Sequence, residues 1–232
     1  NLTMSEPSRF IYEIDPSYLL PYLPKGVELD YYNGKAYISL VGFIFKDSRI
    51  FKAPIPFWGT FEEVNLRFYV TRKIGNEIRR GVVFINETVP NKTVAWVANK
   101  LYKEHYSAIP TKHLWNFKST TKEIEYQWQV SNQWNQLKVI ASNTKEKMKL
   151  GSIEEFIFEH YFGYTKVNVN QAIEYKINHP SWEINHVTEY YINCDFNAFY
   201  GKDFEILNST NPHSVMLAEG SEISVDWKRS RF

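Results

Sequence analysis

Three hydrogen-bonding residues alternate along one short stretch of the chain. In FEEVNLRF, Glu63, Asn65 and Arg67 stand two positions apart, separated by Val64 and Leu66. Because successive side chains of a strand point to opposite faces, this spacing places a carboxylate, an amide and a guanidinium on one face. Such a set can orient a small polar ligand, with Arg67 pairing to a ligand carboxylate. The alternative is a solvent-facing side of a strand that carries a simple Glu–Arg pair.

Other catalytic chemistries lack their usual motifs. The six histidines are scattered and no His-Glu-x-x-His or second close pair at ligand spacing occurs, so we expect no metal site. There is no Gly-x-Ser-x-Gly elbow, and no glycine-rich loop of the kind that binds a nucleotide phosphate. We therefore expect no bound cofactor. The segment His179-Pro180-Ser181-Trp182 either lines the mouth of a pocket or forms a turn with a structurally bonded histidine.

Composition restricts the partners. The chain has 232 residues, and 27 basic against 26 acidic side chains give a net charge of +1, too balanced for the positive field that nucleic acid or an anionic membrane requires. The only cysteine, Cys194, has no disulfide partner, which predicts a reducing, cytoplasmic location. Sixteen Tyr, sixteen Phe and seven Trp suit strands and wide pockets, and they also allow a subunit interface and hence a homo-oligomer.

The elements that position the polar set are mostly strands. The stretch VELDYYNGKAYISLVGFIF, residues 27–45, predicts a hairpin around Asn33-Gly34, a pair that favours a tight primed turn. Its second strand is apolar on both faces, so something must cover each face. Residues 91–103 predict an amphipathic helix that starts at the Asn91 cap and covers the outside of that strand. The apolar positions of this helix are Val94, Val97, Ala98 and Leu101.

The rest of the chain extends this pattern. Residues 122–130 alternate strictly between apolar and polar side chains and predict a hairpin with residues 137–141, while Ser152 opens a capping box for a short helix. Residues 46–61 predict a proline-containing loop. About ten or more strands and three or four helices without regular alternation favour an α+β, mostly β fold with a large antiparallel sheet. We expect one domain over residues 1–232. Further strands are predicted at residues 63–71, 81–88, 165–169, 172–178, 182–191, 213–217 and 223–227, and a turn or short helix at residues 194–200.

Several of these segments together resemble one protein family. The ordered blocks include LPKGVELD, NGKAYISLV and EVNLRFYV, and they are similar to the DUF2071 family of uncharacterised bacterial proteins, also called YqjF-like. The blocks lie at residues 23–30, 33–41, 63–70, 81–84, 151–156 and 179–182.

The resemblance extends to acetoacetate decarboxylase and implies a large antiparallel barrel or cone with outer helices and an internal ligand cavity. The decarboxylase forms a Schiff base on a lysine whose pKa is lowered by an adjacent lysine. Aligning its helix on this chain places that pair near Tyr106-Ser107, where no Lys-Lys pair stands. The resemblance therefore implies a protein without Schiff-base decarboxylase activity, and it aligns a pocket glutamate of the decarboxylase near Glu63.

We therefore expect a barrel whose cavity binds a small carboxylate or keto compound. If the protein is an enzyme, which the sequence leaves open, Glu63 and Tyr106 are the expected acid–base pair and Arg67 the anchor. The alternative is a non-catalytic structural or assembly protein with aromatic-rich interfaces. The candidate cavity residues are Glu63, Asn65, Arg67, Tyr106 and His105, joined by Tyr37 and Ser39 if their side of the strand faces the cavity.

Overall fold

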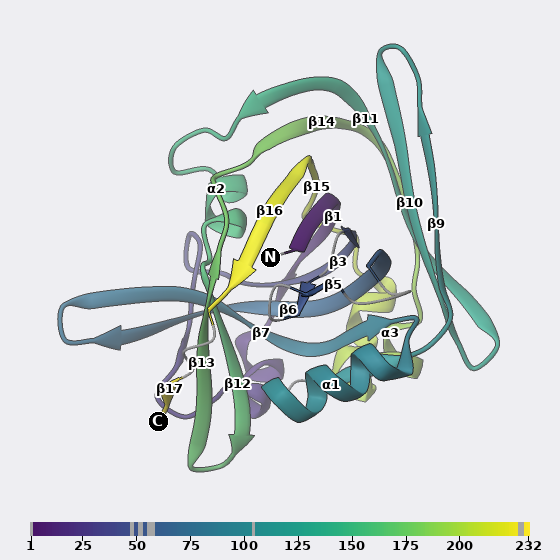
Figure 1. Ribbon diagram of the computed structural model, residues 1–232. Coiled ribbons are helices and arrows are strands. Elements are labelled where there is room, and N and C mark those ends of the chain that lie inside the picture. The colour runs from purple at the N-terminus through teal and green to yellow at the C-terminus, as the bar shows by residue number, and fades with distance from the viewer. Residues whose placement is uncertain (1, 47–48, 51–52, 55–58, 104, 227–229) are drawn as a thin grey trace.

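The computed structural model describes residues 2–46, 49–50, 53–54, 59–103, 105–226 and 230–232, and only the backbone at 49–50, 53–54, 97–98 and 101–102. Much of the predicted loop at residues 46–61, and the side chains of Val97, Ala98 and Leu101, therefore lie outside the described residues. Strands dominate, as predicted, and helices are few (Figure 1).

The strands and helices of the described residues follow the chain in this order. The first half contains β1 (Leu2–Ile14), 3-10 helices Pro16–Tyr18 and Leu20–Tyr22, β2 (Glu28–Leu29), β3 (Ala36–Lys46), β4 (Arg49–Ile50), β5 (Ala53–Pro54), β6 (Phe61–Ile74), β7 (Glu77–Val89), α1 (Lys92–Tyr102), β8 (Tyr106–Ala108) and β9 (Thr111–Phe117). The second half contains β10 (Thr121–Val130), β11 (Gln133–Lys147), α2 (Ile153–Phe158), β12 (Phe162–Asn168), β13 (Gln171–Asn178), β14 (Glu183–Asn193), α3 (Phe196–Tyr200), a 3-10 helix Lys202–Ser209, β15 (Ser214–Ala218), β16 (Gly220–Val225) and β17 (Ser230–Arg231).

Part of the large sheet closes into a ring. The pairings run β1, β3, β6, β7, β12, β13 and β16, and β16 pairs back onto β1. Neighbours in the ring are antiparallel except β12 and β7, which pair in parallel through Phe162 with Gly81 and Gly163 with Val82. Closure removes free sheet edges from this part of the molecule and creates an inside and an outside.

A second group of strands wraps around the outside of the ring. It continues from β1 through β15, β14, β11, β10 and β9, and Figure 1 shows β11 and β14 arching over the ring with β9 and β10 beside it. Side chains of β10 and β11 share one apolar cluster with the outer face of β3 and β6. At Gly42 the layers meet so closely that a Cβ would lie 2.7 Å from the Tyr126 ring.

This arrangement explains the strand that is apolar on both faces. Every residue of β3 from Ala36 to Phe45 is buried, because one face meets the β10–β11 layer and the other faces the inside of the ring. The prediction that the helix at residues 91–103 covers the outer face is wrong. Helix α1 starts after Asn91 as predicted, since the Asn91 side chain accepts from two backbone N–H groups, but α1 lies beside β7 and β8.

The predicted hairpin at residues 27–45 is right in its turn and wrong in its pairing. Asn33 and Gly34 have φ angles of 51° and 76°, as a primed turn requires. The short β2, however, pairs with β6 through Glu28 with Thr71, not with β3. The predicted hairpin of β10 and β11 is confirmed over its whole length.

Helix α2 occupies one end of the inside of the ring. The Ser152 hydroxyl accepts from the N–H of Glu155, as the capping box predicts, and the helix buries Phe156, Ile157 and Phe158. These three residues share the inner apolar cluster with Tyr37. None of the described helices is long and apolar enough to cross a membrane.

Candidate functional site

The alternating polar residues of β6 point into the ring. Glu63, Asn65 and Arg67 are only 2%, 1% and 8% exposed. Val64 and Leu66 between them belong to the apolar cluster that β6 shares with β10 and β11. The alternative of a solvent-facing strand side is therefore wrong. The apolar residues must meet the β10–β11 layer, and this turns the polar ones inward.

These side chains border a cavity of about 190 Å³ inside the ring. Strands β1, β3, β6, β7, β13 and β16 contribute to its wall together with β8 and the segment of α2. The described residues that line it are Leu2, Met4, Arg9, Phe43, Phe45, Glu63, Asn65, Arg67, Val82, Phe84, Glu87, Tyr106, Ile157, Phe158, His160, Tyr175, Ile177, His179, Trp182, Ile223 and Val225.

Glu63 is held by neighbouring side chains. Its Oε1 accepts from Nδ2 of Asn65 at 3.0 Å, and its Oε2 accepts from the hydroxyl of Tyr106 at 3.3 Å. Tyr106 belongs to β8. The side chain of Asn99 in α1 fixes its backbone, since it donates to the Tyr106 carbonyl oxygen at 2.9 Å and accepts from the Tyr106 N–H at 2.7 Å. Burial, followed by the charges of Glu63 and Glu87, raises the pKa of Tyr106 well above its ordinary value. The phenol therefore stays protonated at neutral pH and donates a hydrogen bond to Glu63.

Arg67 has no carboxylate partner among the described residues. Its Nε is buried without a hydrogen bond, and its guanidinium lies 6.0 Å from the centre of the Phe84 ring. Arg67 is one of the residues that line the cavity. A buried guanidinium in this state can pair with an anion that enters the cavity.

A second arginine lies in the same cavity wall. Arg9 of β1 is 4% exposed, donates from Nη1 to the backbone oxygen of Ile157 at 3.2 Å, and stacks 4.0 Å above the Phe158 ring. Burial, and then the charge of Arg67, lowers its pKa well below the ordinary value. The sequence pattern does not predict Arg9, because it indicates no strand, and hence no inward face, in the first fourteen residues.

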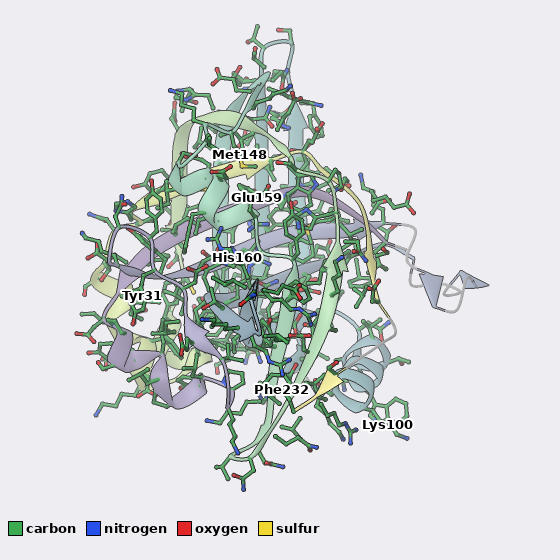
Figure 2. The ribbon with its side chains drawn as sticks, turned by 90° about the vertical axis from the view of Figure 1, so that its left-hand side faces the viewer. Tyr31, Lys100, Met148, Glu159, His160 and Phe232 are labelled. Carbon is green, nitrogen blue, oxygen red and sulfur yellow. The ribbon has the colours of Figure 1, made fainter. Side chains whose placement is uncertain are left out.

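A buried histidine also borders the cavity. Nε2 of His160 lies 3.0 Å from Oδ2 of Asp30, the same oxygen that accepts from Nε of Arg80 at 2.8 Å. Burial lowers the pKa of His160 to about 4, so at neutral pH the imidazole is uncharged and donates its Nε2 proton to Asp30. Its Nδ1 is buried without a hydrogen-bond partner. Figure 2 shows His160 near the middle of the molecule, below α2.

The predicted site residues are only partly brought together. Glu63, Asn65, Arg67 and Tyr106 line the cavity. His105, although next to Tyr106, is exposed and borders a separate groove between β7, β12 and the 3-10 helix at Leu20–Tyr22.

Tyr37 and Ser39 face inward but are not among the described cavity-lining residues. The hydroxyl of Ser39 lies 2.6 Å from that of Tyr69, and Tyr37 packs against Phe156 of α2. This side of β3 therefore packs against α2 inside the ring, and the barrel and the strand register are both retained.

His179, the other histidine singled out by the sequence, lies in the cavity wall. It is stacked between Tyr161 and Trp182, each at 4.6 Å between ring centres, and its Nδ1 lies 2.8 Å from the backbone oxygen of Pro180. His179 is therefore a structurally bonded histidine that also lines the cavity, although residues 179–182 form no assigned turn. Among the described residues, no group of three or more His, Cys, Asp or Glu side chains could hold a metal ion.

Comparison with known sequences identifies the family of this chain. The model of DUF2071, described as an uncharacterized conserved protein, matches residues 10–222. The uncharacterized protein YqjF of Bacillus subtilis (strain 168) is 44% identical over 61 residues. That match spans 26% of this chain and only 25% of the length of YqjF.

Solved structures share the fold at low identity. An acetoacetate decarboxylase-like enzyme from Sphingomonas wittichii RW1 matches with a TM-score of 0.64 and 11% identity, over 100% of this chain and 92% of that one. Acetoacetate decarboxylase from Legionella pneumophila matches with a TM-score of 0.59 and 12% identity, over 97% of this chain and 87% of that one. The enduracididine biosynthesis enzyme MppR, complexed with pyruvate, matches with a TM-score of 0.59 and 9% identity, over 97% of this chain and 89% of that one. These likenesses establish the acetoacetate decarboxylase-like fold.

Proposed function

Because this chain belongs to the DUF2071 family and has the acetoacetate decarboxylase-like fold, we propose that it binds a small carboxylate or keto compound in the cavity of its ring. Arg67 anchors the carboxylate of the ligand, and the Glu63–Tyr106 pair faces the rest of it. We also place the protein in the cytoplasm, since the single Cys194 is a free thiol.

The observation that carries the proposal is the state of Arg67. Desolvating a guanidinium is costly unless an anion and hydrogen bonds compensate for the lost water. Arg67 is 8% exposed, and no carboxylate of the described residues pairs with it. A ligand carboxylate can accept two parallel hydrogen bonds from the terminal nitrogens and complete the pair. One neighbour of the same fold was solved with pyruvate, a keto acid, which agrees with this ligand class.

Binding in this cavity is non-covalent in our proposal. None of the described cavity-lining residues is a lysine, and the segment around Tyr106 that aligns with the decarboxylase lysines has no Lys-Lys pair. Proton transfer at the carbon next to a carbonyl is open to the Glu63–Tyr106 pair, because a carboxylate that receives a hydrogen bond from a phenol can exchange a proton with a substrate beside it. Whether such turnover occurs is decided by deuterium exchange into a bound keto acid.

The test combines binding with trapping. Isothermal titration with pyruvate, acetoacetate and other small keto acids should give binding that Arg67→Ala abolishes while the circular dichroism spectrum stays native. Borohydride added to the same mixtures should leave the protein mass unchanged. A trapped lysine adduct would contradict the proposal. So would a wild-type protein that binds none of these acids while Arg67→Ala merely unfolds.

An assembly role is the second candidate, and one surface favours it. Strand β9 ends the sheet, so one of its backbone edges has no neighbouring strand in the described residues, and it exposes Leu114 and Phe117 at 58% and 56%. Such an edge can pair with another chain. Light scattering after size exclusion measures the mass in solution. An oligomer that Phe117→Ser disperses, in a protein that binds no carboxylate, would favour assembly over ligand binding.

A further inference from the structure

The cavity has two chemically different ends. Along the paired strands β3 and β6, Ser39 faces Arg67, Val41 faces Asn65, Phe43 faces Glu63, and Phe45 faces Phe61. Along this strand pair, the side chains therefore change from buried polar groups at Arg67 to aromatic groups at Phe45. The polar groups of the inner end lie side by side, since Asn65 also pairs with Glu87, and Glu87 with Tyr106.

The other end is apolar and lies nearer to solvent. Leu2 pairs with Ile223, Met4 with Phe45, and Ile177 with Val225, and all six line the cavity. Leu2, Ile177 and Val225 are half-buried, whereas Arg67 and Glu63 at the polar end are buried. A ligand that enters past these half-buried apolar residues reaches Arg67 and Glu63 with its charged group first.

The volume indicates what fits beside the charged group. An engineered apolar cavity of about 150 Å³ in another protein admits benzene. The cavity here measures about 190 Å³, so it has room for a ring of that size together with a carboxylate. A two-carbon or three-carbon acid would leave the apolar end unfilled and its lining without contacts.

From these two ends we infer that the ligand is a carboxylate carrying an apolar tail about the size of a benzene ring, aromatic or branched aliphatic. This inference rests on the proposed function, and it adds the class of tail. The carboxylate reaches Arg67, and the tail lies between Met4, Phe45 and Ile223 at the mouth. Selectivity between acids then comes from the buried apolar area of the tail, not from the charge, which all of them share.

Three probes separate the tail from the charge. They are 3-phenylpropionate, propionate and 3-phenylpropionamide, each titrated into the full chain by calorimetry. Burial of a phenyl-sized group predicts that 3-phenylpropionate binds about 10- to 150-fold more tightly than propionate. The neutral amide should bind at least about 10-fold more weakly than 3-phenylpropionate, since it cannot pair with Arg67.

A variant at the mouth tests where the tail lies. Leu2→Trp narrows the apolar end at a half-buried position, so it should remove most of the advantage of 3-phenylpropionate while propionate binds as before. The matched control is Val169→Trp, because Val169 is 78% exposed and does not line the cavity, and this variant should bind all probes like the wild type. Thermal melting of both variants identifies any loss of fold.

Each outcome has a distinct meaning. If both acids bind equally well, the inferred tail is wrong and the carboxylate site of the proposed function stands. If neither acid binds, or if the amide binds as well as the acid, the proposed function fails as well. If the advantage of 3-phenylpropionate survives Leu2→Trp in a folded protein, the tail does not lie at the mouth and the inference is overturned.

Discussion

Replacement of Arg67 by methionine should make the unliganded protein more stable. Arg67 is buried, lacks a carboxylate partner among the described residues, and has a buried Nε without a hydrogen bond. Methionine has a similar length and an unbranched side chain, so Arg67→Met removes the charge without leaving a large void. Binding residues that carry such uncompensated costs exchange stability for function.

The magnitude follows from the burial of the charge. The effective penalty for a buried ion is several kcal/mol, and contact with the face of the Phe84 ring offsets about 0.5–1 kcal/mol of it. Charges elsewhere in the cavity wall offset a further part. We expect a net gain of about 2 kcal/mol in the free energy of unfolding, or a Tm about 4–8 °C higher for a chain of this length.

Arg72, on the same strand, is the matched control. Its Nη1 pairs with Oε2 of Glu174 at 3.0 Å, and its guanidinium lies 3.3 Å above the Phe232 ring. The same substitution there, Arg72→Met, removes the ion pair with Glu174 and should destabilise the protein by about 1–3 kcal/mol. Urea unfolding of both variants without ligand measures the two changes. A loss of stability in Arg67→Met comparable to that in Arg72→Met would refute the view that Arg67 is unpaired.

Three further predictions address acid stability, ring closure and proton transfer. The folded pKa of His160, about 4, lies below the ordinary value of 6.5, so the stability that the neutral imidazole contributes is complete above pH 6.5 and is lost as the pH falls toward 4. Urea unfolding should show that the wild type loses about 3 kcal/mol of stability over this pH range and that His160→Gln does not. An equal dependence of stability on pH in the two proteins would contradict this. Gly220 closes the ring with φ +76°, and a Cβ there would lie 2.0 Å from the Met4 carbonyl oxygen, so Gly220→Ala should cost more than about 2 kcal/mol in thermal melts, whereas a neutral change would argue against the closure. Glu63→Gln should slow deuterium exchange into the C3 position of bound pyruvate, followed by proton NMR, by about 100-fold or more with an unchanged Kd, and an unchanged exchange rate would exclude Glu63 as the base.

Local patterns predicted the parts of the fold that depend on neighbouring residues. The turn at Asn33-Gly34, the cap at Asn91 and the alternation along β10 each rest on side chains within a few positions of each other. The alternation of Glu63, Asn65 and Arg67 also predicted their common face. Which face points inward depends on the β10–β11 layer, so the choice between cavity and solvent stayed open in the sequence.

The features that were missed depend on contacts distant in the chain or on irregular strands. In β1 the register shifts between Ser5 and Ser8, and Glu6 has a φ of 48°, so the bulge interrupts the alternation that would have revealed the strand and the inward position of Arg9. The contact of His160 with Asp30 joins residues 130 positions apart, and no local signal predicts it.

A crystal structure of the protein soaked with 3-phenylpropionate is the most direct measurement of the central claim. We predict that the cavity holds the ligand with its carboxylate oxygens about 2.7–2.9 Å from the terminal nitrogens of Arg67 and its ring between Met4 and Ile223. A carboxylate bound away from Arg67, or a cavity closed by its own side chains in the presence of ligand, would contradict the account.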